Sequence, residues 1–222
     1  MIDYLLAYPD KLLTPLVQHL ELLVVTLVIS LAVAAVLTMA SMYSKALART
    51  LTYLFSIIYS IPSLALFVLL IPLTGLGTTT ALIVLVIYNQ YLLLRNFLAG
   101  LEGVDPAIIE AATGMGMSTM QILVKIRLPL AKKVLFTGIR LSAVSTIGII
   151  TIAALINAGG IGTLLFDGLR TMNTVKILWG AILAGGLAIA ADALLKLVEK
   201  RLGGWGQTHP ATLKEPSIKE TP

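Results

Sequence analysis

The residues whose side chains could carry chemistry are few, and most of them stand in one polar stretch. The chain has no cysteine, and its two histidines, His19 and His209, stand near opposite ends, so the sequence offers neither a thiolate site nor a clustered metal site. No nucleophile is paired with a base. We therefore expect no catalytic residue, no metal and no cofactor. What stands out is a pair of motifs nine residues apart: Glu110-Ala111-Ala112-Thr113-Gly114-Met115-Gly116 and Ile126-Arg127-Leu128-Pro129.

The first part of this stretch predicts a short helix that ends in a glycine turn. Asp105 has the side chain of an N-cap, and Pro106 follows at the first helical position, where a missing N–H costs nothing. The helix should run to about Thr113. Gly114 and Gly116 should end it, because glycine readily adopts the left-handed conformation that a helix C-terminus often needs.

The second part predicts another helix. Ser118 and Gln121 have the spacing of a capping box, which starts a helix. Pro129 should close the unit by turning Leu128 away from helical conformation. The stretch is thus interpreted as helix, glycine turn, helix. On these residues alone, the unit could equally be a plain loop between two membrane spans.

The composition indicates a membrane protein. Of 222 residues, 58% are hydrophobic and only 12% are charged, and the mean hydropathy is +0.96. A soluble domain needs far more charge on its surface. The net charge of +5 invites a nucleic-acid interpretation, but most basic residues stand beside the ends of apolar runs. That distribution is typical of membrane topology, and we expect no nucleic-acid partner.

Five apolar segments are long enough to cross a bilayer, which requires about 20 residues each. The sequence predicts an all-α, polytopic membrane protein with transmembrane helices over residues 22–44, 50–71, 78–98, 134–155 and 175–197. Pro62 lies inside the second span and should kink it. Pro72, Gly75 and Gly77 should form the turn before the third span.

The segments outside the spans define the expected domain organisation. Residues 1–19 read as an external N-terminal arm, residues 20–202 as the transmembrane domain with a polar loop over about 100–130, and residues 203–222 as a disordered tail too short to be a domain. Ligand capture should therefore come from another chain. Residues 157–162 should form a glycine-rich turn, and residues 163–174 an interfacial helix on the external side.

Several charged residues lie at or inside the spans. We expect His19 and Glu21 to be solvated at the outer mouth of the first span. Arg140, about two turns into the fourth span, should extend to the interface, although contact with a partner subunit is the alternative. Asp192 in the last span should be neutralised by basic neighbours, which are Lys196, Lys200 and Arg201. Gly180, Ala184 and Gly185 give that span a small face suited to close packing.

The positive charges predict the orientation. Thirteen of the lysines and arginines fall on the side of the Glu110 loop and three fall on the other side. Since basic residues concentrate in cytoplasmic loops, the Glu110 loop and the C-terminus should be cytoplasmic and the N-terminus external.

The paired motifs resemble a known family. Glu110, Ala111, Ala112, Gly116, Ile126, Leu128 and Pro129 match the EAA loop of the permease subunits of binding-protein-dependent ABC importers. The resemblance implies that the loop lies at the cytoplasmic face of a bacterial membrane and that its first helix docks into a groove on the ATPase. The coupling residues would be Asp105, Glu110, Ala111, Ala112, Gly114, Gly116 and Pro129.

A more specific resemblance covers residues 15–200. Segments such as Ile61-Pro62-Ser63-Leu64-Ala65-Leu66, Leu94-Arg95-Asn96 and Ala158-Gly159-Gly160-Ile161-Gly162 are similar to permeases for glycine betaine, carnitine and choline. This implies osmoprotectant uptake. The implied partners are an ABC ATPase subunit that binds ATP, a separate solute-binding lipoprotein that holds the quaternary ammonium group in an aromatic cage, and a second permease subunit that is a copy or a homologue.

Polar residues inside the second and third spans are candidates for the translocation path, because a zwitterion needs a polar path of low net charge. They are Tyr59, Ser60, Ser63, Tyr88, Asn89 and Gln90. Polar side chains in a membrane also join helices, and the sequence leaves both roles open. An importer of another betaine-like or amino-acid substrate is the alternative. A stand-alone channel or secondary transporter is disfavoured, because the second and third spans lack the charges that ion coupling requires.

Overall fold

The computed structural model describes residues 2–202, and these form helices joined by short turns, with no strand among them. The predicted disordered tail lies outside the described residues. The elements are α1 (Ile2–Ala7), α2 (Asp10–Met42), α3 (Lys45–Ser60), α4 (Ser63–Thr74), α5 (Thr78–Glu102), α6 (Pro106–Gly114), α7 (Thr119–Ile122), η1 (Leu123–Arg127), α8 (Leu128–Ala153), η2 (Ala154–Ile156), α9 (Gly162–Arg170) and α10 (Thr174–Leu202).

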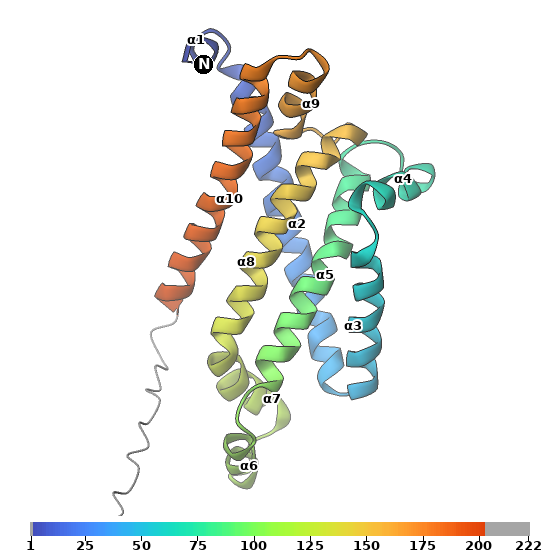
Figure 1. Ribbon diagram of the computed structural model, residues 1–222. Coiled ribbons are helices and arrows are strands. Elements are labelled where there is room, and N and C mark those ends of the chain that lie inside the picture. The colour runs from blue at the N-terminus through green and yellow to red at the C-terminus, as the bar shows by residue number, and fades with distance from the viewer. Residues whose placement is uncertain (1, 203–222) are drawn as a thin grey trace, which may run out of the picture.

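The bundle is built around α5, which packs against α2, α3, α4 and α8 (Figure 1). The main apolar core joins α2, α4, α5 and α8, and its fully buried side chains include Phe67, Val84, Leu85, Ile147 and Ile150. α10 lies at one edge of the bundle, beside α8 and α9. One end of the bundle carries α6 and α7, here called the α6 end, and the opposite end carries α1 and α9, here called the α9 end.

Four helical segments are long and apolar enough to cross a membrane, and a fifth span exists if α3 and α4 are counted as one broken span. The all-α prediction is therefore confirmed. The predicted kink at Pro62 is a sharp break, with α3 and α4 bent by 98°. Ile61, the residue before the proline, is extended with ψ 133°, as the proline ring favours. Pro72 was expected in the next turn but lies inside α4; positive φ angles at Gly75 and Gly77 make that turn.

The helices extend beyond the predicted spans, most of all at the first and the fourth. α2 begins at Asp10, so residues 10–19 form its first turns, and α1 precedes it as a separate short helix. The fourth span is continuous with the polar loop, because helical structure runs unbroken from Thr119 to Ile156. Leu128 keeps helical angles of φ −60° and ψ −47°, so the prediction that Pro129 ends the helix is wrong. The wider π-helical turn η1 comes just before Pro129 and gives the proline ring room.

The glycine-rich turn at the α9 end is fastened to α2. Its Asn157, Gly159 and Gly160 have left-handed backbone angles. The N–H of Gly160 donates to Gln18 Oε1 at 3.1 Å, and the N–H of Ile161 donates to His19 Nδ1 at 3.3 Å. His19 is completely buried, so the expectation that water solvates it is wrong.

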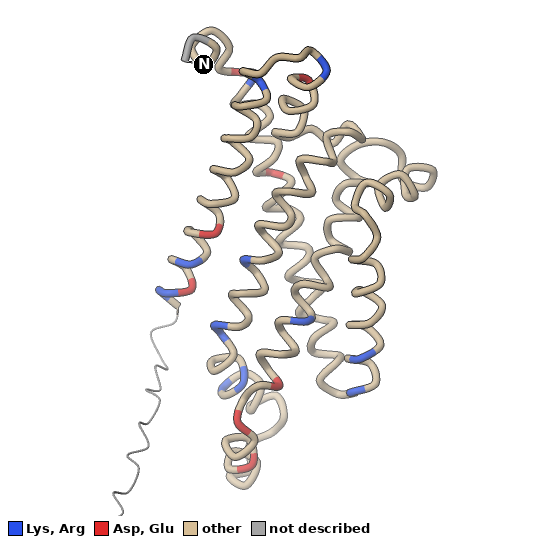
Figure 2. The backbone as a smooth tube through the Cα atoms, in the orientation of Figure 1, with Lys and Arg blue, Asp and Glu red and all other residues tan. Residues whose placement is uncertain are grey.

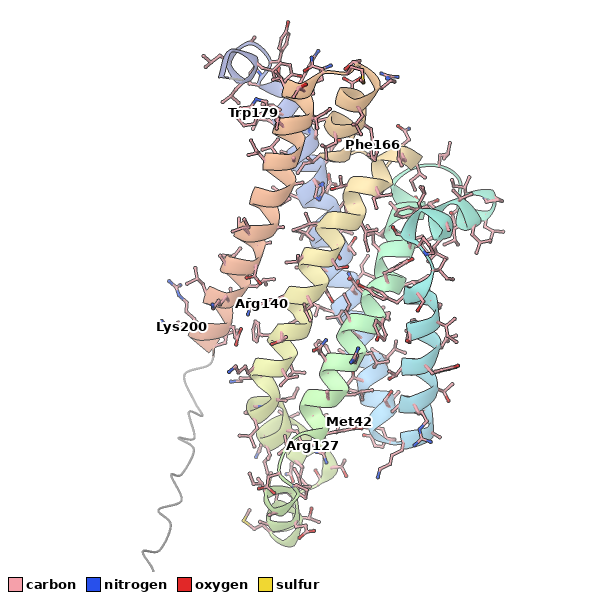
Figure 3. All side chains as sticks on the ribbon, viewed as in Figure 1. Met42, Arg127, Arg140, Phe166, Trp179 and Lys200 are labelled. Atoms are coloured by element: carbon pink, nitrogen blue, oxygen red, sulfur yellow. The ribbon has the colours of Figure 1, made fainter. Side chains whose placement is uncertain are left out.

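An ion-pair group joins α10 to α8. Arg140 is labelled in Figure 3. Its Nε and Nη2 donate to the two carboxylate oxygens of Asp192 at 2.7 and 3.0 Å, and Glu199 Oε2 lies 3.7 Å from its Nη1. The prediction that Arg140 extends to the interface is therefore wrong. Asp192 is hydrogen-bonded to this arginine, and Lys196, one of the predicted basic neighbours, adds an electrostatic attraction. Nearer the N-terminus of α10, Gly180 packs closely on Leu165 of α9, whereas Gly185 has open space around it.

Candidate coupling hairpin and membrane-embedded polar sites

The polar stretch between α5 and α8 forms a helical hairpin, which consists of α6, the turn at residues 115–118, and α7. Asp105 caps α6, because its Oδ1 accepts the N–H of Ala107 at 2.9 Å. Gly116 has φ +79°, as predicted for the turn. Gly114 is the last residue of α6, so its predicted left-handed conformation is wrong. The hairpin projects beyond the bundle at the α6 end (Figure 1).

The turn closes with the predicted capping box. The N–H of Ser118 donates to Gln121 Oε1 at 2.8 Å, and the N–H of Gln121 donates to Ser118 Oγ at 3.3 Å. The N–H of Met117 also reaches back to the carbonyl of Ala112 at 3.1 Å. These local bonds satisfy backbone groups that helix ends leave unpaired, so the hairpin can keep its shape while its outer face stays exposed.

The exposed surface of the hairpin mixes one carboxylate with apolar side chains. Glu110 is exposed, as are Ile108 and Met115, whereas Ala112 is buried under the hairpin. Ala111 is exposed beside Glu110, and Pro129 is half-buried where α8 begins. A small exposed helix with an apolar patch and one acidic residue fits docking to another protein better than contact with lipid.

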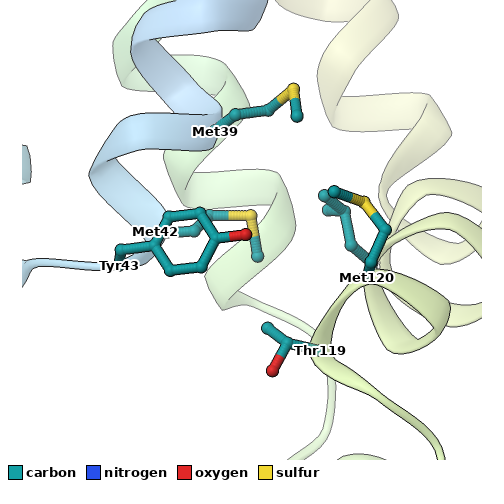
Figure 4. A pocket seen from close by; sticks show the side chains of 6 residues that line it. Met39, Met42, Tyr43, Thr119 and Met120 are labelled. Atoms are coloured by element: carbon teal, nitrogen blue, oxygen red, sulfur yellow. The ribbon is translucent and has the colours of Figure 1, made fainter.

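The base of the hairpin contacts α2 and α5 and continues directly into α8, because Leu123 of η1 lies in one apolar cluster with Leu101 of α5 and Met42 of α2. Arg127 Nη1 donates to the carbonyl of Leu101 at 3.0 Å, which ties η1 to the end of α5. A crevice of about 10 Å³ separates α7 and η1 from the end of α2 (Figure 4); it is lined by Met39, Met42, Tyr43, Thr119, Met120 and Leu123. It is too small for a solute. A displacement of the hairpin would therefore act on α2, α5 and α8 through packed contacts.

Two of the candidate path residues lie in the middle of the bundle. Asn89 Nδ2 donates to Ser30 Oγ of α2 at 3.2 Å, and Thr146 Oγ1 of α8 donates to Asn89 Oδ1 at 3.1 Å. Gln90 Nε2 donates to the Ser30 carbonyl at 3.3 Å. Asn89 and Gln90 are each only 2% exposed. In this chain they therefore join α2, α5 and α8, here called the α2–α5–α8 junction.

The other candidate path residues surround the break at Pro62. The hydroxyl of Tyr88 donates to the carbonyl of Ile61, and the ring of Tyr59 packs against the rings of Tyr88 and Tyr91 with centroid distances of 5.4 and 4.9 Å. Ser63 begins α4. The hydroxyl of Ser60 bonds within α3, to the carbonyl of Ser56 at 2.9 Å.

Sequence reasoning did not assign four residues to these sites: Ser30, Thr146, Tyr91 and Arg95. Arg95 joins the group through Tyr91, because its Nη1 donates to the Tyr91 hydroxyl at 3.0 Å. Ser30 and Thr146 carry no local signal, because single hydroxyls occur throughout apolar spans. Tyr91 and Arg95 do carry one, since residues four apart share a helix face. Among residues 2–202, no three His, Asp or Glu side chains are grouped to hold a metal ion.

The chain matches a known family over most of its length. Residues 27–204 match the binding-protein-dependent transport system inner membrane component family. The chain therefore belongs to this family, and it is a multi-pass membrane permease of an ABC importer that works with an ATPase and a substrate-binding protein.

Curated relatives and solved structures agree with this assignment. The chain is 37% identical to the carnitine transport permease protein OpuCB of Listeria monocytogenes, over 83% of this chain and 85% of the relative. It is 32% identical to the choline transport system permease protein OpuBB of Bacillus subtilis (strain 168), over 91% and 93%. The inward-facing MetNI methionine ABC transporter shares the fold, with a TM-score of 0.79 at 20% identity over 86% of this chain and 95% of that chain.

Proposed function

We propose that this chain imports quaternary ammonium compatible solutes, namely glycine betaine, carnitine and choline, as the transmembrane subunit of an ATP-driven importer. The observation that carries the proposal is the agreement between an exposed, self-capped hairpin at the α6 end and relatives that are named carnitine and choline permeases across nearly their full length. ATP is bound and hydrolysed by a separate ATPase subunit.

The α6 end and the C-terminus face the cytoplasm, and α1 and α9 face the outside. Lys45 and Arg49 in the first turns of α3 and the basic residues of η1 lie toward the α6 end, whereas Lys11, Arg170 and Lys176 lie toward the α9 end. Figure 2 shows basic residues at both ends of the bundle, with more of them toward the α6 end. The larger number of basic residues at the α6 end supports this orientation.

The hairpin is the coupling element. The side chains at its exposed face, Glu110 and Ala111, meet the ATPase, and the capped ends at Asp105 and Gly116 keep α6 rigid. Ala112 is 1% exposed and lies inside the hairpin, where α6 contacts α7. Closure of the ATPase on ATP moves the hairpin, and its contacts with α2, α5 and α8 pass that movement into the membrane.

The importer contains a second permease subunit and an external solute-binding lipoprotein. Most of the α10 surface and one face of α2 are apolar and exposed in this chain, so lipid and a second subunit can cover them. The translocation path runs past Tyr59, Ser60 and Ser63, and the buried Tyr88, Asn89 and Gln90 hold the helices that line it.

The proposal is tested by purifying the tagged chain in mild detergent at low salt and identifying the bound proteins. The complex with its ATPase and binding protein is then reconstituted, and ATP-dependent uptake of glycine betaine, carnitine and choline is measured. Uptake of at least one of these solutes that requires ATP and the binding protein is the expected result. A chain that purifies alone, and conducts a solute when it is reconstituted alone, would show that it is a channel.

A further inference from the structure

A continuous group of aromatic and cationic side chains runs along α3 and α5, from the break at Pro62 toward the α6 end. Ile61 lies at the C-terminus of α3, where helix carbonyls lose their partners, and its carbonyl accepts the hydroxyl of Tyr88. Tyr59 packs on Tyr88 and on Tyr91. The break thus fixes the position of Tyr59 against α5.

The group ends at a cation. Arg95 Nη1 donates to the hydroxyl of Tyr91 at 3.0 Å, and the guanidinium lies 5.9 Å from the centre of the Tyr91 ring. Arg95 is exposed, no carboxylate within residues 2–202 forms an ion pair with it, and it stands seven residues before the end of α5 at Glu102. Its hydrogen bond is made one turn back, at Tyr91, and not toward the helix end.

This placement argues against a face covered by lipid. A guanidinium inside a span is costly against lipid and normally faces protein or water. Arg140, an arginine inside another span, has two carboxylates as partners, whereas Arg95 has a neutral hydroxyl. The face that carries Tyr59, Tyr91 and Arg95 therefore lies toward a polar space in the assembled importer.

We propose that Tyr59, Tyr91 and Arg95 form a binding site for zwitterionic quaternary ammonium solutes within the membrane. The two tyrosine rings attract the trimethylammonium group through cation–π interaction, and the guanidinium of Arg95 binds the carboxylate in charge-assisted hydrogen bonds. Tyr88, which is 4% exposed, positions Tyr59 and does not touch the solute. The site rests on the proposed function, since it assumes that such solutes pass through this chain.

The site predicts a selectivity that can be measured. Glycine betaine and choline carry the same trimethylammonium group, but only glycine betaine has a carboxylate. With the binding protein saturated by each solute in turn, Arg95→Gln should lower glycine betaine uptake about tenfold and change choline uptake less than about twofold. Arg95→Lys should keep most of the glycine betaine uptake. Tyr59→Leu and Tyr91→Leu should lower the uptake of both solutes.

The controls come from the same two side-chain types on α3. Arg49→Gln and Tyr53→Leu change exposed residues outside the group and should leave both uptakes unchanged. Bound ATPase, measured for each variant, shows that the complex assembles. Equal loss of both solutes in Arg95→Gln, or unchanged glycine betaine uptake, would overturn the site.

The outcomes also separate this site from the proposed function. If the unmodified importer takes up neither solute, the proposed function fails before any variant is tested. If it takes up glycine betaine but not choline, Arg95→Lys and Arg95→Gln decide: retained uptake only in the lysine variant supports the site, and equal uptake in the two variants contradicts it.

Discussion

α5 and α10 are both apolar helices that can cross a membrane, yet they are used in opposite ways. In its most apolar window, 56% of α5 is buried inside the chain, whereas none of α10 is. α10 is nevertheless the more apolar of the two helices over that window. In a membrane, lipid can cover apolar side chains as well as protein can, so apolarity does not indicate which helix is central.

The polar residues show the difference better. α5 holds its neighbours through neutral side chains, with Asn89 and Gln90 bonded at the α2–α5–α8 junction. α10 is held in its C-terminal half by a charged group, Arg140 with Asp192 and Glu199. Directional polar contacts therefore determine where each helix sits, and the following changes test this view.

The largest effect is expected from removing the cation that holds α10. Arg140→Leu leaves Asp192 and Glu199 without their shared partner inside a span, which is costly. Thermal unfolding in detergent should show the greatest loss of stability among these changes, and adding Asp192→Leu should restore part of it. Lys133→Leu, an exposed basic residue on the same helix, is the control. Equal unfolding temperatures for Arg140→Leu and Lys133→Leu would mean that the ion pair does not hold α10.

The next effect concerns the α2–α5–α8 junction. Asn89→Ala removes two hydrogen bonds between helices and leaves the hydroxyls of Ser30 and Thr146 without this partner, at a cost of about 1 kcal/mol in the free energy of unfolding. Transport should fall while the ATPase still binds. Asn96→Ala is the matched control, because Asn96 donates only within α5, to Leu92. If the two variants lose the same stability and transport, the hydrogen bonds of Asn89 between helices contribute no more than the bond of Asn96 within α5.

A smaller effect separates the two halves of α10. A Cβ at Gly180 would lie 2.5 Å from Leu165 Cγ, whereas one at Gly185 would meet nothing within 4 Å. Gly180→Ala should therefore destabilise the chain, and Gly185→Ala should stabilise the helix by up to about 1 kcal/mol. Thermal unfolding of the purified chain measures both. Destabilisation by Gly185→Ala would contradict the open space around this glycine.

The smallest effect is a pH dependence at the α9 end. Hydrogen bonds from Lys176 and Arg170 lower the pKa of Asp167 below its ordinary value of 3.8. Because the folded-state pKa is the lower one, the stabilisation is complete above pH 3.8 and is lost as the pH falls through the folded-state value. The difference in unfolding temperature between the unmodified chain and Asp167→Asn should be constant from about pH 8 to about pH 5 and should shrink in more acidic solution. A difference that grows toward acid would contradict this assignment.

The local features of the hairpin could be predicted because their causes lie close in sequence. Asp105, Ser118 and Gln121 cap helices within three residues of themselves, and Gly116 adopts its left-handed angle within one turn. The prediction that Pro129 ends the helix failed because the π-helical turn before it accommodates the proline ring. No residue type within that turn indicates a π-helix in the sequence. The helices also continue past the predicted spans. The predicted ends lie where charged residues end an apolar segment, but a helix can continue through charged residues.

The long-range contacts could not be predicted from one sequence. Arg140 and Asp192 are 52 residues apart, and His19 lies 142 residues from the N–H that it accepts. From the sequence, Arg140 could lie at the interface and His19 in water. The packing of α8 on α10 excludes the first placement, and the packing of the glycine-rich turn on α2 excludes the second. The roles of the hairpin in coupling and of the polar residues in transport stay predictions.

The measurement that tests the central claim most directly compares two glycines of the hairpin. Gly114 and Gly116 are both exposed, and a Cβ at either position would meet nothing within 4 Å, but only Gly116 has a left-handed φ, of +79°. Gly114→Asp and Gly116→Asp therefore add the same charge to the same surface and differ in the backbone strain that they impose.

ATP hydrolysis by the reconstituted complex, stimulated by the solute-loaded binding protein, is measured for both variants. If the hairpin transmits the movement of the ATPase, Gly116→Asp abolishes the stimulation while the chain still inserts into the membrane, and Gly114→Asp keeps more of it. Normal stimulated hydrolysis in Gly116→Asp would mean that the shape of this turn is not needed for coupling, and it would contradict the account.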